Sequence, residues 1–186
     1  PVVTFGNRAF DNSLIELQDL LETHGFHAIA AAAFSCEHSF SDTLGAGRPD
    51  DADLEDAENF AFAVSGKLIK AAAFGQPIAS VKVDGDLQAG YYQPRDRHGV
   101  FIDIRKVKPL TSAACDHCGL CAAVCPMGAI DPQDVSQVPG ICIKCGACIK
   151  KCPQSAKYYD DAGYLYHKEE LEAMYGARHA ANSFYL

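Results

Sequence analysis

The sequence predicts an α+β protein in which an α/β segment comes first and a small, separate module follows it. Three observations predict this architecture. Apolar runs alternate with helical periodicity at the start of the chain, glycine and proline interrupt its middle, and eight of the nine cysteines lie between Cys115 and Cys152. We therefore divide the chain into an α/β segment (1–74), a connector (75–110), a cysteine module (111–159) and a C-terminal helix and tail (160–186).

The first segment alternates between strand and helix. Val2–Phe5 is a short run of β-formers, and leucines at helical spacing follow it as far as Gly25, a helix stop. The continuous apolar run 28–34 is typical of a parallel strand that is covered on both faces. Pro49 and the acidic residues from Asp50 onward suit the N-terminus of a second helix. Two successive strand–helix units predict a parallel sheet.

A sheet of only two such strands leaves an edge open, and open edges invite pairing with further strands. We therefore expect additional strands upstream of Pro1, where the sequence begins without a methionine. The alternative is that another chain supplies them, either as a homodimer or as the missing half of this domain. In both cases the segment 1–74 is part of a larger sheet.

Composition limits the class of protein. A chain of 186 residues with 48% hydrophobic residues can bury a core without disulfides. Its longest apolar run, 28–34, is far shorter than the roughly 18 residues that a membrane span needs, and its first residues do not resemble a signal peptide. A net charge of −8 argues against nucleic acid and anionic membranes as partners. We expect a cytoplasmic protein whose cysteines stay reduced.

The cysteine module contains one motif twice. The pattern C-x2-C-x2-C-x3-C-P begins at Cys115 and begins again at Cys142, 27 residues later. Gly119 recurs at the same interval as Gly146, which identifies an internal duplication. Three cysteines two residues apart can wrap three corners of a cubane iron–sulfur cluster, and the fourth thiolate then comes from elsewhere.

This spacing is typical of paired 4Fe-4S clusters in which the fourth cysteine of each motif serves the other cluster. Structural zinc is the stronger alternative, but zinc prefers two separated cysteine pairs. A disulfide framework is the weaker one, because nine cysteines leave one thiol over. The spacing thus assigns Cys115, Cys118, Cys121 and Cys152 to cluster 1, and Cys142, Cys145, Cys148 and Cys125 to cluster 2.

With both motifs complete, residues 111–159 resemble the two-cluster bacterial-type ferredoxins. The resemblance implies a duplicated βαβ fold, metal binding through two 4Fe-4S clusters and low-potential, one-electron transport. It also implies sensitivity to oxygen. No aspartate replaces a ligand cysteine, so three-iron variants of the cluster are not expected.

The order of segments resembles that of flavodoxin–ferredoxin fusions, the Fe-S flavoproteins. In this resemblance residues 1–74 correspond to the C-terminal half of a flavodoxin-like domain, and the loop after the first strand contacts the flavin ring. The Ser/Thr-rich loop that holds the FMN phosphate has no counterpart here. The resemblance therefore implies FMN binding only when the missing half of the domain is supplied. The residues that map onto the ring loop are Gly6, Asn7, Arg8, Ala9, Phe10 and Asp11.

We expect a low-potential electron-transfer protein that relays single electrons through two clusters to or from a flavin domain, with redox proteins as partners. The alternatives are the electron-input part of a flavin-dependent reductase and a redox-sensing iron–sulfur interaction protein. The sequence contains no visible nucleophile–base pair or acid–base dyad, so we assign no catalytic residues and favour a carrier over a stand-alone enzyme. We interpret Cys36 as a small buried hydrophobe and His38 as a hydrogen-bonded loop residue.

Overall fold

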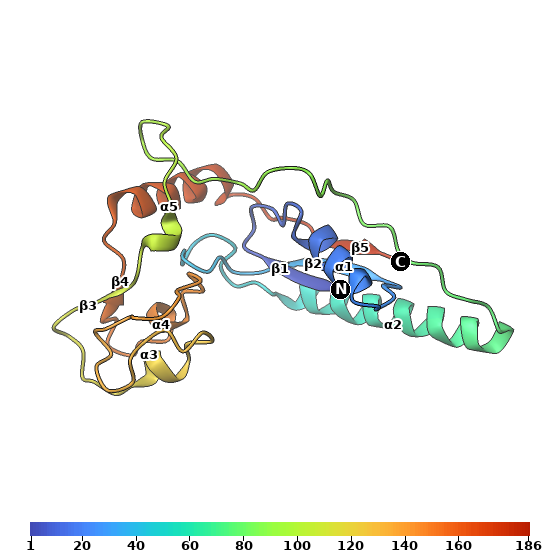
Figure 1. Ribbon diagram of the computed structural model, residues 1–186, viewed down its shortest axis with the longest axis horizontal. Helices are drawn as coiled ribbons and strands as arrows, with labels where there is room; N and C mark the ends of the chain where they lie inside the picture. The colour runs from blue at the N-terminus through green and yellow to red at the C-terminus, as the bar shows by residue number, and fades with distance from the viewer. The chain divides into compact units, whose positions relative to one another are not determined.

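The computed structural model describes all residues, Pro1–Leu186, and divides into two compact units (Figure 1). Both units are assembled from segments that are distant in the sequence. None of the helices is both long and apolar enough to cross a membrane. The first unit contains Pro1–His38, Asp42–Tyr92 and Tyr175–Leu186, and the second contains Ser39–Ser41 and Gln93–Met174.

A three-stranded sheet forms the centre of the first unit. Strand β1 (Val2–Phe5) pairs in parallel with β2 (Ala31–Ser35), as the sequence predicts, with Val2 opposite Ala32. On its other edge β2 pairs antiparallel with β5 (Ser183–Tyr185), so the strand order is β1-β2-β5. The central position of β2 explains its continuous apolar sequence, because three of its alanines have no exposed surface.

Two helices cover opposite faces of this sheet. Helix α1 (Ser13–Thr23) buries Leu14 against the alternate residues Ala31 and Ala33 of β2. Helix α2 (Asp51–Phe74) packs against the other face, where Phe60 contacts Phe34 and Phe184. The far end of α2 extends beyond the sheet (Figure 1).

The ends of both helices follow their sequence signals. Helix α1 stops at His24, and Gly25 then adopts a left-handed φ of 86°. Helix α2 begins with a reciprocal capping box between Asp50 and Asp53, and Gly75 ends it in the left-handed conformation. The acidic start at Asp50 therefore acts as a helix cap.

The tail at the C-terminus forms a strand that we did not expect. Residues 183–185 form strand β5, which covers the second edge of β2. This chain's own C-terminus thus pairs with one edge of β2, whereas the outer edge of β1 has no partner strand and our expectation of further strands stays a prediction. Asn182 fixes the approach, because its Oδ1 accepts from the Ser35 backbone N–H at 2.9 Å and its amide donates to Asp53 at 2.9 Å. A single asparagine thus joins the strand to the helix N-terminus.

The second unit contains the cysteine module between short elements. The first of these are a 3-10 turn, η1 (Ile104–Lys106), and β3 (Leu110–Thr111), which pairs antiparallel with β4 (Lys157–Tyr158). Single-turn helices α3 (Leu120–Ala123) and α4 (Ala147–Lys150) lie between β3 and β4 in the chain. Helix α5 (Ala162–Tyr175) then follows, within the segment 160–186 where we expected a helix.

This β-α-α-β order differs from the duplicated βαβ fold that the sequence suggested. Each half contributes one strand and one helical turn, and the residues between α3 and α4 form turns instead of a ladder. Side chains satisfy the backbone in these turns: Asp131 accepts from the N–H of Gln133 and Asp134 accepts from that of Ser136. The connector is similarly irregular, with one antiparallel bridge between Arg95 and Phe101.

Candidate metal centre

The two cysteine motifs share one backbone conformation. His117 and its counterpart Lys144 have φ values of 58° and 60°, and Gly119 and Gly146 have φ values of 76° and 72°. Left-handed residues at matching positions turn each loop tightly enough for three cysteines to face one space. The 27-residue duplication in the sequence is therefore a duplication of structure in these loops.

One cavity brings together the first three cysteines of the second motif and the last cysteine of the first motif. Apart from its four thiols, its wall is largely apolar and includes Ile130, Ile143 and Tyr159. Cys148 is 9% exposed, whereas Cys145 lies at the surface. The four cysteines that line this cavity are Cys125, Cys142, Cys145 and Cys148.

A second cavity brings together the first three cysteines of the first motif and the last cysteine of the second motif. Its wall differs in character because Asp116 and Lys157 contribute to it. Cys121 is buried and Cys118 is exposed, which repeats the pattern of the other cavity. The four cysteines that line it are Cys115, Cys118, Cys121 and Cys152, so each cavity brings together one of the two crossed sets that the spacing assigned.

Backbone N–H groups point at several of these sulfurs. Ala129 and Ala156 donate to Cys125 and Cys152, each at 3.3 Å, and His117 donates to Cys115 at 3.4 Å. Burial acts to raise the pKa of Cys152, but the backbone donors around it outweigh burial and lower that pKa. Fixed N–H donors of this kind stabilise a thiolate, the form that binds metal.

Cys148 shows the opposite effect. Burial raises the pKa of its thiol to about 11, although the charge of Lys157 acts to lower it, so the free sulfur stays protonated at neutral pH. Binding of a metal to this cysteine must therefore release a proton.

The arrangement of thiols suits a cluster better than a single ion. No three His, Cys, Asp or Glu side chains are close enough together to hold one metal ion. A tetrahedral zinc site needs four sulfurs within about 2.3 Å of one centre. Thiols spread around a cavity suit a polynuclear cluster, in which each cysteine binds a different iron.

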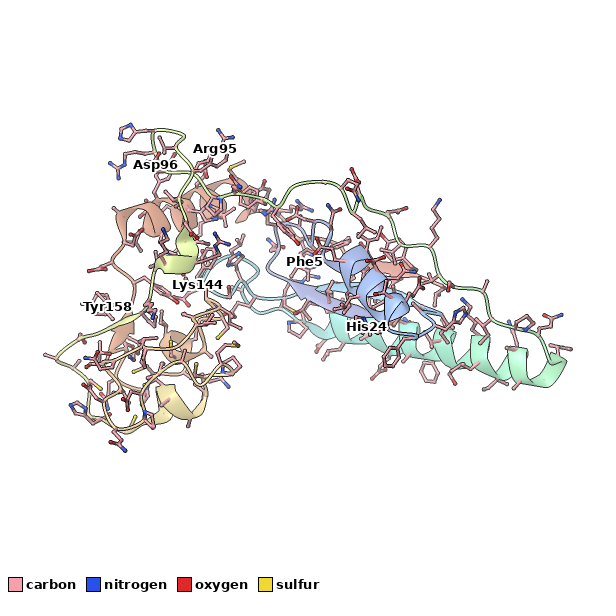
Figure 2. All side chains as sticks on the ribbon, viewed as in Figure 1. Phe5, His24, Arg95, Asp96, Lys144 and Tyr158 are labelled. Carbon is pink, nitrogen blue, oxygen red and sulfur yellow. The ribbon has the colours of Figure 1, made fainter.

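Two buried lysines lie near the cysteines, and Figure 2 labels one of them, Lys144. Lys144 is buried and donates to the carbonyl oxygens of Arg105 and Cys142, at 2.7 and 3.0 Å. Lys157 is also buried and donates to the carbonyl of Val135. Lys157 was missed in the sequence, because the two-residue strand that carries it is too short to show a periodicity.

The segment Ser39–Ser41 is a second feature that the sequence did not indicate. Lys150 donates to the carbonyl of Ser41 at 2.7 Å, and Gly146 lies so close to the carbonyl of Ser39 that a side chain there would collide with it. Gly119, the counterpart of Gly146, has open space instead. The two motifs therefore have the same backbone but different surroundings.

The predicted flavin-ring loop is packed against its own chain. Asn7 is 1% exposed, and its amide donates to the carbonyls of Tyr175 and Arg178 at 3.1 and 2.7 Å while its Oδ1 accepts from Ala180. Its polar groups therefore already have partners.

The neighbours of Asn7 are engaged as well. Arg8 pairs with Asp11 and stacks on the ring of Tyr92, and Phe10 packs on Phe5 with ring centroids 5.4 Å apart. Gly6 lies against the ring of His38, whereas Ala9 is exposed. In this arrangement the loop holds the C-terminal segment, and its residues do not fit a flavin ring.

Cys36 is half-buried, and not the fully buried residue that we expected. Burial raises its pKa, and Asp53 adds to that effect. His38 lies in a loop and its backbone N–H donates to the carbonyl of Leu44 at 2.9 Å. The structure brings neither residue to a cysteine cavity.

Comparison with known proteins identifies one family. Residues 114–156 match the 4Fe-4S dicluster domain family, so this segment is ferredoxin-like and of the iron–sulfur, metal-binding type. No curated protein and no solved structure matches the chain. The match covers both cysteine motifs and supports an electron-transfer role, and it gives no support for a flavodoxin-like segment.

Proposed function

We propose that this chain is a low-potential electron-transfer protein that holds two 4Fe-4S clusters in its two cysteine cavities. The single observation that carries the proposal is the crossed lining of these cavities, each with three thiols of one motif and the fourth of the other. Bound clusters of this type supply reversible one-electron chemistry. We assign cluster 1 to Cys115, Cys118, Cys121 and Cys152, and cluster 2 to Cys142, Cys145, Cys148 and Cys125.

The protein's own groups hold charge and position the sulfurs. Four thiolates give each cluster a net negative charge, and N–H donors from Ala129 and Ala156 stabilise that charge on the sulfurs of Cys125 and Cys152. Burial of Cys121 and Cys148 keeps water from one side of each cavity. The exposed thiols Cys118 and Cys145 bring the other side to the surface, where a redox partner can approach.

We infer that the partner is a redox protein that carries its own flavin. The strand–helix units of the first unit resemble part of an FMN-binding domain. In this chain, however, the amide of Asn7 is buried and already bonded, and Gly6 packs against His38. If the chain is instead the electron-input part of a flavin-dependent reductase, its clusters carry out the same one-electron transfer and the flavin lies in another domain or chain. None of the nine cysteines is paired in a disulfide, which suits a reducing compartment such as the cytoplasm.

Iron and acid-labile sulfide per chain test the proposal directly. Protein purified without oxygen should contain about eight of each, because two clusters of four irons are bound. The visible spectrum should show the broad absorption of iron–sulfur charge transfer, bleached by dithionite. Zinc without sulfide, or about four irons per chain, would contradict the two-cluster proposal.

A further inference from the structure

The two halves of the cysteine module differ at a position next to the ligands. Tyr159 lies 17 residues after Cys142, and the residue at the matching place after Cys115 is Pro132. Tyrosine offers a hydroxyl donor, whereas proline offers none. A contact made by Tyr159 to the cluster 2 ligands therefore has no counterpart at cluster 1.

Tyr159 makes such a contact. Its hydroxyl oxygen lies 3.9 Å from the sulfur of Cys142, within hydrogen-bonding reach of a large sulfur atom, and its ring lines the cluster 2 cavity. The sulfur of a cluster ligand is a thiolate without a proton. The phenol is then the donor and Cys142 the acceptor.

Packing holds the phenol in this place. The ring of Tyr159 lies 4.3 Å from that of Tyr164, which is 1% exposed, and Tyr164 in turn packs against Phe40 with centroids 5.1 Å apart. Tyr159 follows β4, whose pairing with β3 fixes the backbone. A donor whose ring is the first in a row of three packed rings does not have to be ordered when the charge on the cluster changes.

We propose that the Tyr159 hydroxyl donates to the Cys142 thiolate and holds cluster 2 at a higher reduction potential than cluster 1. This inference rests on the proposed function. Each cluster with four thiolates becomes more negative on reduction, so a donor at a ligand sulfur stabilises the reduced form more than the oxidised form. Tyr159 is a positioning and tuning residue, since it acts on the cluster through Cys142.

Charges near cluster 1 must be weighed against this hydrogen bond. Asp116 lines the cluster 1 cavity and disfavours added negative charge, whereas Lys157 lines it and favours that charge. Lys144 lies beside cluster 2 through its bond to the Cys142 carbonyl. Lys157 also lowers the pKa of Cys148, so its charge acts on both sets of cysteines. Asp116 opposes reduction of cluster 1, and the Tyr159 hydroxyl favours reduction of cluster 2.

The test is a redox titration of Tyr159→Phe, followed by electron paramagnetic resonance. Phenylalanine keeps the ring packing and removes only the donor. A hydrogen bond of ordinary net strength corresponds to about a fivefold change in an equilibrium constant. The ratio of reduced to oxidised cluster 2 at a fixed potential should therefore fall about fivefold, or ~40 mV at 59 mV per tenfold change. Cluster 1 should not move.

Matched controls identify the cause and the cluster. Tyr158→Phe removes the hydroxyl of the adjacent tyrosine, which is 41% exposed and lines neither cavity, so both potentials should stay unchanged. Repeating the titration with Cys118→Ala, which disables cluster 1, isolates the cluster 2 signal. Replacement of the tyrosines by fluorotyrosine, a more acidic donor, should raise the potential of cluster 2 and tests the idea in a chain of unchanged shape.

Two results would overturn the inference, and they differ from failure of the proposed function. If the wild-type protein contains about eight irons and its cluster 2 potential is the same as that of Tyr159→Phe, the hydroxyl does not tune this potential. A Tyr158→Phe shift as large as that of Tyr159→Phe refutes the specific contact. Wild-type protein with fewer than two clusters instead overturns the proposed function, and this inference with it.

Discussion

The crossed ligation predicts how cysteine variants combine. Cys125 lines the cavity of Cys142, Cys145 and Cys148, although Cys121, only four residues before it, lines the other. Cys125→Ala therefore removes one of four thiols from cluster 2 and none from cluster 1. Iron should fall from about eight to about four atoms per chain, with an equal loss of sulfide.

Double variants make this prediction decisive without a spectral assignment. If Cys125 and Cys145 serve the same cluster, Cys125→Ala with Cys145→Ala should still retain about four irons. Cys125→Ala with Cys118→Ala should retain almost none, because one thiol is lost from each cavity. Cys36→Ala is the matched control, since Cys36 lines neither cavity and its loss should leave iron unchanged.

The assay is iron and sulfide content after anaerobic purification, with circular dichroism to show that each variant is folded. Uncrossed ligation, in which each motif supplies all four ligands of its own cluster, exchanges the two outcomes. Four irons in Cys125→Ala/Cys118→Ala and none in Cys125→Ala/Cys145→Ala would refute the reasoning from the cavities.

Three further predictions follow from the packing. Asp53→Asn should destabilise the first unit by about 3–5 kcal/mol in urea unfolding, because Asp53 and Arg48 form a buried ion pair and the variant leaves the guanidinium unpaired. The hydrogen bond from Arg48 lowers the pKa of Asp53 below the unfolded value of about 3.9. The stabilisation is therefore complete above that pH and should shrink as the pH falls towards the folded pKa. A stability difference between wild type and variant that is constant from pH 6 to pH 3 would contradict this. Gly146→Ala should lower the melting temperature of the cluster-containing protein more than Gly119→Ala, because both glycines have a positive φ but only Gly146 lies against the Ser39 carbonyl. Equal losses would show that the segment Ser39–Ser41 moves to make room for the added methyl group. Tyr164→Phe should leave stability unchanged or raise it by up to about 1 kcal/mol, because the buried hydroxyl has no hydrogen-bond partner and the ring is kept; a clear loss in thermal unfolding would mean that the hydroxyl has a partner.

The local elements of the first unit could be read from the sequence with good accuracy. Capping signals at Asp50 and Gly25 placed the ends of α2 and α1 to within a residue or two, because a helix end depends on a few neighbouring residues. The parallel pairing of β1 with β2 followed from the apolar run and is confirmed. Strand β5 was missed, since three residues at the end of a chain carry too little pattern to indicate a strand.

The resemblance to flavodoxin is not confirmed, and the surroundings of the predicted ring loop could not be read from the sequence for a related reason. The run from Gly6 to Asp11 has suitable residues for a loop at the carboxyl end of a parallel strand. What fills the space above such a loop depends on distant parts of the chain. Here the carbonyls of Tyr175 and Arg178 reach the amide of Asn7 from more than 160 residues away, and no local pattern reports such a contact.

For the candidate metal centre the sequence alone determined the eight cysteines, their duplication and the type of cofactor that the spacing suits. These properties are local, because a tight loop with cysteines two residues apart can face only one small space. The tertiary structure decided what surrounds each cysteine set: the segment Ser39–Ser41 and the phenol of Tyr159 at one, Asp116 and Lys157 at the other. Two motifs with the same backbone thereby acquire different environments, because a neighbour's charge and hydrogen bonds depend on distance in space and not on position in the chain.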